Sequence, residues 1–440
     1  MEKILKKIET LQKRHDKPNP KLIAEKNIKL GLRNPDGTGV VVGITSKGQV
    51  KGHNKTSEGV EPTHGQLFYC GYNIYDLVKN LEKEKVFGFN EITYLLLTGE
   101  LPSEEDLNIF SIVVSKKRSL TPDEKEKIRI NQSCENSSVM NTLRTTVSSM
   151  SNCDSDPDST ELKNVTLQSI NLIAKFPTII TYIYNIKYGR NLFEPKEELS
   201  TSENFLYMLT GQIPDEFTAH LFDLMLILHA EHGGGNNSTF TVRTVSSSGA
   251  NTYSAIAAGL GSLAGHLHGG ANEAVMRMME DIKSNVKDWD SDKEVKEYLT
   301  KILEKQAGDR SGKIYGIGHA VYTLSDPRAL IIEKKVKQLA EKVEKTKEYA
   351  LYKKIALIAP QLIKEKKGKV VSPNVDFYSG FVYNAIGIST ELFTPIFAMA
   401  RVAGWSAHRI EQLIQGKIIR PAYVSSLKEE KEYISISKRS

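Results

Sequence analysis

The chain has 440 residues, of which 40% are hydrophobic and 25% charged, and its net charge is +6. The length predicts two to three domains, and the composition is typical of a soluble globular protein. No apolar run approaches the roughly 18 residues that a membrane span requires. Lysines alternate with glutamates, as in residues 333–354, which indicates solvated helix faces. The composition therefore argues against membrane and nucleic-acid partners, while the modest positive excess suits small anionic substrates.

The N-terminus and the cysteines indicate the compartment. Residues 1–17 are lysine-rich, contain two glutamates and lack an apolar block before a cleavage site. They predict a short surface helix in place of a secretory signal or an organelle transit peptide. Cys70, Cys134 and Cys153 occur at unrelated spacings, which argues against a disulfide framework or a zinc ribbon. We therefore expect a cytoplasmic protein in a reducing environment.

Most of the chain has helical periodicity, with one exception near the N-terminus. Residues 27–53 contain the turn signature NPDG and the β-prone run VVVGIT, which predict a small hairpin. Residues 131–160 are polar and begin as a predicted loop, with a polar-faced helix over residues 140–150. Apolar residues recur at helical spacing in residues 67–81, 219–232, 251–282 and 394–413. The sequence therefore predicts an all-α fold with one short β-hairpin.

Four short motifs concentrate histidine, glycine and aspartate in the second half of the chain. They are HAEHGGGN (229–236), LHGGAN (267–272), GIGHAVYTLSDPR (316–328) and PNVDFYSG (373–380). Taken singly, each has a structural interpretation, because a histidine or glycine near a helix end usually caps or ends the helix. Loop polar residues nevertheless carry function more often than other positions. Nucleotide-binding fingerprints are missing, since no GxxxxGKS/T occurs and no GxGxxG follows a predicted strand.

Together, these motifs resemble those of the citrate synthase family in order and approximate spacing. DGTGVVVGIT (36–45) and GYNIYDL (71–77) are similar to the N-terminal region of bacterial members, so the likeness extends over residues 28–424. The resemblance implies an acyltransferase that condenses acetyl-CoA with oxaloacetate and water to give citrate and CoA, at the entry to the tricarboxylic acid cycle. It implies no bound cofactor, because acetyl-CoA is a co-substrate.

The resemblance also implies an architecture of two helical domains. The large domain comprises residues 1–270 and 390–440, and a smaller inserted domain comprises residues 271–389. The site would lie in the cleft between them, where closure excludes water.

Three residues match the catalytic positions of the family. Asp376 matches the base that removes a methyl proton from the thioester, and His268 matches the donor to the thioester oxygen as enol character develops. His319 matches the residue that polarises the ketone of oxaloacetate. A carboxylate can act as this base if burial raises its pKa, and histidines can act as neutral donors if a neighbour fixes the tautomer.

Further positions match residues that bind the substrates. His232 matches a histidine that reaches the ketone oxygen, and Arg328 and Arg401 match arginines that hold the two carboxylates. Arg420 matches a third arginine, which enters the site of the partner subunit, so the resemblance implies a homodimer. Binding of CoA is implied for Gly316, Gly318 and Lys369.

The motif HAEHGGGN allows a second interpretation, as a metal site. His229 matches a structural histidine and Asn236 a substrate contact, and the glycines let a helix end close to a ligand. Alternatively, His229, Glu231 and His232 could hold a metal ion. The pattern is not HExxH and lacks the usual carboxylate arrangement of a catalytic zinc site, so we expect no metal.

The sequence departs from the family pattern at a few positions. His266 stands where proline is common, Ala320 and Thr323 where basic residues are common, and Cys70 where arginine is common. These changes bear on the contacts to the CoA phosphates and on packing, and none removes a group that the reaction needs.

Three other functions are alternatives. One is a 2-methylcitrate synthase using propionyl-CoA, since one methylene changes the volume of a pocket and not its catalytic groups. The second is a non-catalytic CoA- or citrate-binding sensor of the same fold, and the third is a metal-dependent hydrolase.

Overall fold

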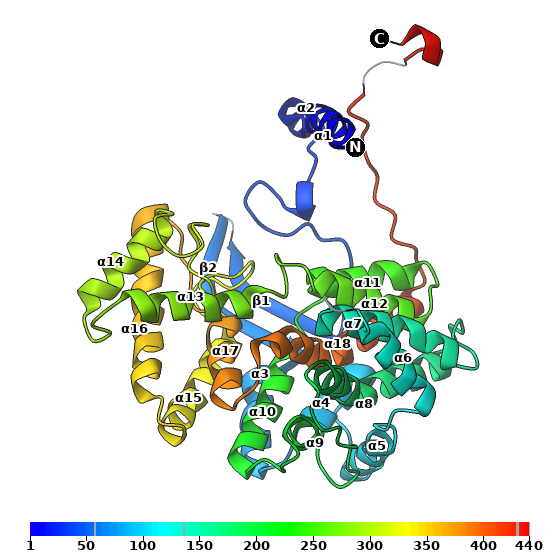
Figure 1. Cartoon of the computed structure of the whole chain (residues 1–440), viewed down its shortest axis with the longest axis vertical. Helices are drawn as coiled ribbons and strands as arrows, with labels where there is room; N and C mark the ends of the chain where they lie inside the picture. The colour runs from blue at the N-terminus through cyan, green and yellow to red at the C-terminus, as the bar shows by residue number, and fades with distance from the viewer. Residues whose placement is uncertain (57–58, 135–136, 428–430, 440) are drawn as a thin grey trace. The chain divides into compact units, whose positions relative to one another are not determined.

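The computed structural model describes residues 1–56, 59–134, 137–427 and 431–439. These residues form eighteen α-helices and one three-stranded antiparallel sheet (Figure 1), which confirms the predicted all-α class. Contacts divide the chain into two compact units, one of residues 45–418 and one of residues 1–44 with 419–440. The predicted division into a large and an inserted domain stays a prediction. Its ranges include residues 57–58, 135–136, 428–430 and 440, which lie outside the described residues.

No helix in the described part of the chain is long and apolar enough to cross a bilayer.

The unit formed by the two ends of the chain consists of short elements. These are α1 (Glu2–His15), α2 (Pro20–Glu25) and the 3-10 helices η1 (Leu30–Leu32) and η4 (Ile436–Lys438). Asn19 caps α2, because its side chain accepts hydrogen bonds from the first backbone N–H groups of the helix. α1 is the surface helix that the sequence predicted at the N-terminus.

The predicted β-hairpin lies at a different place. β1 (Gly48–Thr56) pairs antiparallel with β2 (Gly59–Tyr69), and β2 pairs with β3 (Tyr72–Asn73). The prediction of a hairpin over residues 27–53 was therefore wrong for its first twenty or so residues. NPDG does form a turn, but the residues that flank it form a single isolated β-bridge, between Arg33 and Gly39, in place of two strands. The turn signal is local, whereas a strand also needs a partner, and here the partner comes after β1.

The remaining helices belong to the unit of residues 45–418. The first ten are α3 (Ile74–Glu84), α4 (Phe89–Thr98), α5 (Glu104–Lys116), α6 (Pro122–Gln132), α7 (Val139–Ser149), α8 (Leu162–Lys187), α9 (Thr201–Thr210), α10 (Glu216–His229), α11 (Asn237–Ser247) and α12 (Thr252–Leu263). They are followed by α13 (Ala271–Asn285), α14 (Asp292–Leu303), α15 (Pro327–Lys342), α16 (Thr346–Lys367), α17 (Val375–Ala385) and α18 (Phe393–Gln415). Two 3-10 helices are η2 (Met150–Cys153) and η3 (Thr390–Leu392). The helix predicted at residues 140–150 is α7, and residues 135–136 of the predicted loop lie outside the described residues.

Helix α18 is the centre of the compact unit (Figure 1). Nearly all of its residues from Phe393 to Gln412 are buried, and it packs against α4, α8, α10, α11 and α12. A helix that is buried on all sides belongs to the interior of a large core. Polar side chains on α18 therefore need partners from the surrounding elements.

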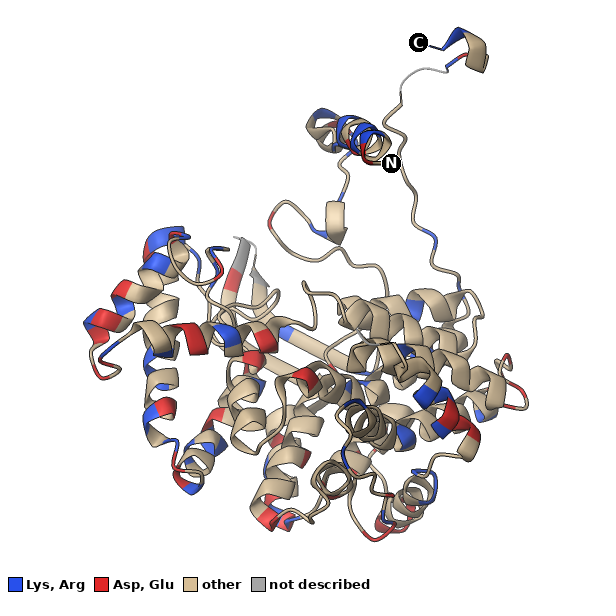
Figure 2. Ribbon diagram, in the orientation of Figure 1, with Lys and Arg blue, Asp and Glu red and all other residues tan. Residues whose placement is uncertain are grey.

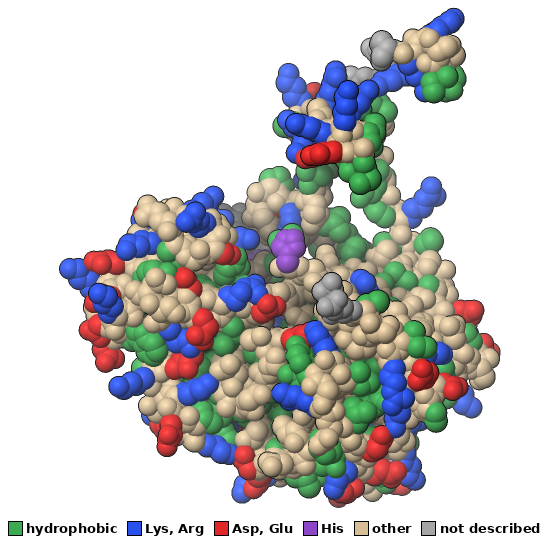
Figure 3. All heavy atoms as spheres, in the orientation of Figure 1, with side chains coloured by type: hydrophobic (Ala, Val, Ile, Leu, Met, Phe, Trp, Pro, Cys, Tyr) green, Lys and Arg blue, Asp and Glu red, His purple; other side chains and the backbone are tan. Residues whose placement is uncertain are grey.

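Charged residues of both signs lie on outer helices such as α14, α15 and α16 (Figure 2). On the face shown in Figure 3, lysine and arginine side chains are interspersed with aspartate and glutamate. Exposed ion pairs such as Lys366–Glu304, between α16 and the residue that caps the end of α14, follow the same pattern. These helices have the solvated faces that the alternating charges predicted.

One predicted helical stretch is interrupted. Residues 251–282 form α12 and α13 with a break at residues 264–270, which contain three glycines. A Cβ on Gly269 would lie 2.1 Å from the carbonyl oxygen of Leu263, so only glycine lets the chain fold back on the end of α12. The break places His268 in a loop.

The β-hairpin supports the loop that carries His319. The backbone N–H of Gly65 donates to the carbonyl oxygen of Ser325 at 3.1 Å, and the hydroxyl of Thr323 donates to the carbonyl of Gly52 at 2.9 Å. Ideal Cβ atoms on Gly52 and Gly65 would each lie 2.2 Å from a carbonyl oxygen of this loop. The two strands therefore approach the loop so closely that no side chain fits between them.

We expect the substitution Gly65→Ala to lower the free energy of unfolding by about 1–3 kcal/mol, because the added methyl group overpacks this contact. Urea and thermal unfolding monitored by circular dichroism measure the change. Gly39→Ala is the matched control, since no atom lies within 4 Å of a Cβ at that position. Equal unfolding midpoints for the two variants would contradict the prediction.

Candidate active site

The motif HAEHGGGN begins at the end of α10. The Nδ1 atom of His229 lies 2.7 Å from the carbonyl oxygen of Met225, and the ring packs against Phe397. Burial lowers the pKa of His229 to about 3, so this ring is neutral. His229 is thus a satisfied interior residue. Among the described residues, no group of three or more His, Cys, Asp or Glu side chains is arranged to hold a metal ion.

His232 lies three residues further on and is in a different state. It is buried, and its Nε2 atom has no hydrogen-bond partner among the described residues. Its ring lies edge-on to His319, with 5.0 Å between the ring centroids. Burial, with the charge of Arg328, keeps the pKa of His232 well below its ordinary value. A buried polar atom without a partner costs about 1–3 kcal/mol, which a ligand oxygen at Nε2 would offset.

His268 has a fixed tautomer. The backbone N–H of Ser238, in the first turn of α11, lies 3.3 Å from its Nε2 atom, and the Ser238 hydroxyl lies 3.0 Å from the same atom. The indole N–H of Trp405 donates to that hydroxyl at 3.3 Å. Because the backbone N–H can only donate, Nε2 must accept, and the proton of the neutral ring is on Nδ1. Burial lowers the pKa of His268 to about 4, so the ring is neutral at neutral pH.

His319 has the opposite tautomer. The backbone N–H groups of Val321 and Tyr322 donate to its Nδ1 atom at 3.0 and 3.1 Å, so the proton of the neutral ring is on Nε2. The ring stacks on Tyr322 with 4.6 Å between centroids. The two histidines therefore present N–H groups from different ring positions.

Two glycines shape the loop before His319. Gly316 and Gly318 have positive φ angles of 76° and 107°, a region that side chains other than hydrogen rarely allow. The N–H of Gly318 donates to Ser372 at 2.8 Å, and the carbonyl of Gly316 accepts from Asn374 at 2.9 Å. These bonds join the loop to the turn before Asp376. Binding of CoA by the two glycines stays a prediction.

Asp326 connects this loop with Arg328 and the turn before α17. It is the N-cap of α15, and both of its carboxylate oxygens accept from the Arg328 guanidinium, at 3.1 and 2.8 Å. The backbone N–H of Val375 donates to the same carboxylate at 3.1 Å. Although burial disfavours charge, Asp326 raises the pKa of Arg328. Sequence reasoning did not identify Asp326, although an aspartate before proline is a helix-start signal.

Asp376 lies in the first turn of α17. Asn374 caps this helix by accepting from the backbone N–H of Asp376, so the Asp376 carboxylate is not used as the cap. Burial raises the pKa of Asp376 to about 6, and the positive charges of Arg328 and Arg401 limit this rise. The group is therefore a carboxylate at neutral pH with an unusually high proton affinity.

Arg401 is a fully buried cation in α18. Its Nε atom donates to the carbonyl of His229 at 2.7 Å, while Nη1 and Nη2 have no hydrogen-bond partner within the described part of the chain. Burial lowers the pKa of Arg401 to about 10, so it stays charged at neutral pH. A buried guanidinium with two unused amino groups is suited to an anionic ligand, which would pair with both.

The predicted site residues are brought together around Arg401. Its charge acts on His232, His268 and Asp376, and Arg328 acts on Asp376 as well. The edge-on contact between the rings of His232 and His319 adds His319 to the group. This is a set of neutral histidine donors, a carboxylate of raised pKa and two buried cations. Such a set can remove a proton from a weak carbon acid, stabilise the oxyanion that forms and hold a dicarboxylate.

Three other predicted residues are exposed or have a structural role. Lys369 is exposed, and Arg420 is an exposed residue of the unit formed by residues 1–44 and 419–440. Asn236 is the N-cap of α11, and its side chain accepts from the Ser238 hydroxyl. The predicted substrate contacts of these residues stay predictions.

Sequence reasoning also missed residues that support the site. These residues are Ser238, Trp405 and His408. Their contacts join parts of the chain that are far apart in sequence: Trp405 and Ser238, for example, are 167 residues apart. No local pattern marks such pairs.

Comparisons with known proteins agree with the motifs. The sequence matches the family described as "Citrate synthase, C-terminal domain" over residues 37–422. It is 39% identical over 363 residues to a citrate synthase of Haloferax volcanii, covering 81% of this chain and 88% of that protein. It is 35% identical over 389 residues to 2-methylcitrate synthase 1 of Corynebacterium glutamicum, covering 86% and 94%.

A solved structure is similar over almost the whole chain. It is the ternary complex of carboxymethyl coenzyme A and oxaloacetate with citrate synthase from Thermoplasma acidophilum. The TM-score is 0.78 at 26% identity, and the likeness covers 94% of this chain and 99% of that one. With the family match over residues 37–422, these findings show that this chain belongs to the citrate synthase family.

Proposed function

We propose that this protein condenses acetyl-CoA with oxaloacetate and water to give citrate and CoA, as a cytoplasmic homodimer at the entry to the tricarboxylic acid cycle. The observation that carries this proposal is Arg401, whose buried guanidinium has no partner for its two amino groups among the described residues. A dicarboxylate such as oxaloacetate would supply the missing anion. Arg328 would hold a second carboxylate, and Arg420 of the partner subunit would complete the binding of oxaloacetate.

The first chemical step is the removal of a methyl proton from acetyl-CoA. The Asp376 carboxylate takes this proton, and its raised pKa brings its proton affinity closer to that of the weak carbon acid. His268 donates from Nδ1 to the thioester oxygen, which gains negative charge as the proton leaves. Its neutral state fits this role, because the hydrogen bond strengthens as the enol forms.

The second step forms the carbon–carbon bond. The enol carbon attacks the ketone carbon of oxaloacetate. As the carbonyl double bond opens, the ketone oxygen takes the Nε2 proton of His319, which the proton taken by Asp376 later replaces. His319, which has its proton on Nε2, and His232, whose Nε2 lacks a protein partner, are suited to bind this oxygen. Water then cleaves the thioester of the product, which releases citrate and the CoA thiol.

A second candidate is 2-methylcitrate synthase, which would use propionyl-CoA. The chain is 35% identical to the 2-methylcitrate synthase of Corynebacterium glutamicum and 39% identical to the citrate synthase of Haloferax volcanii. These identities support the two candidates almost equally. One methylene group is worth roughly 1–3 kcal/mol of discrimination in a pocket, without any change in the catalytic groups.

We expect release of the CoA thiol to depend on oxaloacetate and to be faster with acetyl-CoA than with propionyl-CoA. Thiol release with each acyl-CoA, compared as kcat/KM, measures this preference. A higher kcat/KM for propionyl-CoA would assign the second candidate. No release from the folded protein with either substrate would refute both and favour a binding role.

We expect Asp376→Ala to lower kcat by roughly 10²–10⁴-fold, since it removes the base and leaves the arginines in place. Thiol release gives kcat, and calorimetric titration with oxaloacetate gives the dissociation constant. Binding should stay close to that of the wild type. Turnover near the wild-type rate would refute the role of Asp376.

We expect kcat/KM to fall as the pH is lowered through about 6. Burial raises the pKa of Asp376 from 3.8 to about 6, and only the deprotonated carboxylate can accept a proton. The lost activity therefore lies on the acid side of this pKa, and activity should level off above it. A rate profile from pH 5 to pH 8 tests this, and a flat profile down to pH 5 would contradict it.

A further inference from the structure

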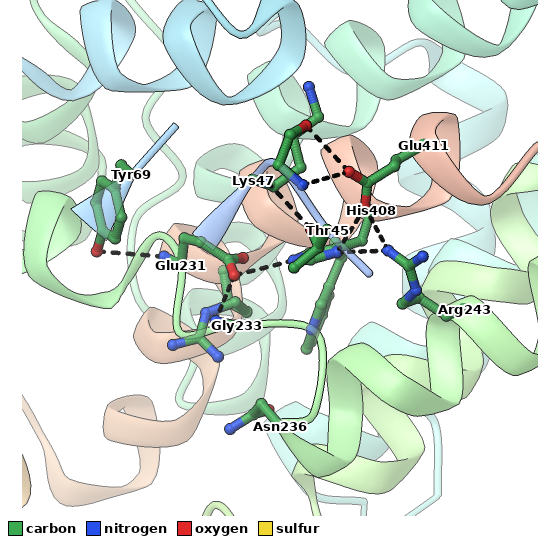
Figure 4. Close-up of polar contacts among 12 residues, drawn as sticks. Thr45, Lys47, Tyr69, Glu231, Gly233, Asn236, Arg243, His408 and Glu411 are labelled. Atoms are coloured by element: carbon green, nitrogen blue, oxygen red, sulfur yellow. Dashed lines mark hydrogen bonds and ion pairs between the residues drawn. The ribbon is translucent and has the colours of Figure 1, made fainter. Parts of the chain in front are cut away.

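A buried network of polar and charged residues surrounds Glu231, the residue before His232 (Figure 4). Glu231 is fully buried, and its Oε1 atom accepts from the backbone N–H of Gly233 and from Nε2 of His408, the latter at 2.9 Å. Arg243 lies 2.9 Å from Nδ1 of the same histidine and forms an ion pair with Glu411 at 2.6 Å. A guanidinium can only donate, so Nδ1 of His408 accepts and its Nε2 carries a proton toward Glu231.

The Glu231 carboxylate spans the backbone of His232. It belongs to the residue before His232 and binds the N–H of the residue after it, so it closes a turn around this histidine. The backbone N–H of Glu231 also lies 3.4 Å from the hydroxyl of Tyr69, whose own hydroxyl donates to Ile227 at 2.9 Å. The backbone on both sides of His232 is thus held by side-chain groups.

Two glycines enclose the carboxylate. Ideal Cβ atoms on Gly48 and Gly404 would each lie 2.4 Å from an oxygen of Glu231, so neither β1 nor α18 could carry a side chain there. Although burial disfavours its charged form, His408 and Arg401 hold the pKa of Glu231 below its ordinary value. A buried anion in this position is stabilised by the N–H donor of His408 and by the positive charge of Arg401.

One face of α18 organises these contacts. Arg401, Trp405 and His408 are spaced four and three residues apart, which places them on the same side of a helix. Arg401 binds the carbonyl of His229, Trp405 binds Ser238 behind His268, and His408 binds Glu231. The same helix face therefore contacts the stretch from His229 to Ser238, which joins α10 to α11, at three points.

We propose that Glu231 is a positioning residue, whose buried carboxylate fixes the turn that presents His232 and places a negative charge against α18 at Gly404, one helical turn from Arg401. This inference rests on the proposed function, because it concerns the binding of oxaloacetate. Glu231 does not touch the substrate. It acts through His232 and Arg401, while α17 and Ser238, and not Glu231, position Asp376 and His268.

The substitution Glu231→Gln tests the proposal, since it removes the charge and keeps the shape. We expect the KM and the dissociation constant for oxaloacetate to rise by about 10- to 100-fold, the range expected when a binding group is misplaced, while kcat changes much less. Steady-state thiol release and calorimetric titration with oxaloacetate measure the two constants.

Asp223→Asn is the matched control. Asp223 is a buried carboxyl residue of α10, and it accepts from the backbone N–H of Gly88 at 2.7 Å, at the start of α4. This variant should lose thermal stability and keep the wild-type KM, because the change from a buried carboxyl to an amide lies outside the network. A rise in KM in Asp223→Asn equal to that in Glu231→Gln would overturn the proposal, since it would reflect general loss of structure.

The outcomes separate this inference from the proposed function. If the wild type is active and Glu231→Gln has the same KM and dissociation constant for oxaloacetate as the wild type, the positioning role alone is refuted. A wild type without turnover would refute the proposed function, and calorimetry would then decide the positioning role: weaker oxaloacetate binding in Glu231→Gln supports it, whereas equal or absent binding in both proteins refutes it.

A second pair of variants applies if Glu231→Gln does not fold. His408→Ala removes the N–H donor to Glu231 and should raise the KM for oxaloacetate, while His408→Gln keeps an N–H donor and should recover part of the affinity. No recovery in His408→Gln, or a wild-type KM in His408→Ala, would overturn the proposal.

Discussion

The burial of the Arg401 guanidinium is the constraint on which the rest of the compact unit depends. A charge inside a protein is costly unless opposite charges and hydrogen-bond acceptors surround it. α18 is buried on all sides, so these groups must come from its neighbours: the carbonyl of His229 and the carboxylate of Glu231. The contacts that make Arg401 tolerable in the interior also bring the segment after α10 to the place where a ligand can complete the arginine's hydrogen bonds.

Two separate anchors hold the polar groups of the site. α18 holds the segment of His232 and, through Trp405 and Ser238, the ring of His268. Asp326 holds Arg328 and the turn before Asp376. The functional side chains thus lie on loops and helix ends, while rigid helices set their positions. Each anchor positions a different part of the proposed catalytic machinery. α18 positions the hydrogen-bond donors His232 and His268, and Asp326 positions the turn before the base Asp376.

The sequence predicted the all-α class and the motif residues, five of which gather around Arg401. Residue types and short spacings carry this information, because the chemistry needs histidine, aspartate and arginine in a fixed order. The position of the hairpin was missed, since the NPDG turn is local while strand pairing depends on the rest of the fold. The partners of Glu231 and Arg243 on α18 lie 165 to 177 residues away along the chain, beyond any local pattern. The domain division and the role of Arg420 remain predictions.

The spacing of Arg401, Trp405 and His408 has a consequence for how the gene of such a protein can vary. An α-helix turns by about 100° per residue, so inserting or deleting one residue between Arg401 and His408 would rotate one anchor away from the other two. Point substitutions on the outer helices leave this phase unchanged. Length in the middle of α18 should therefore be far less free to change than length in the loops between the outer helices, even where the amino acids themselves differ.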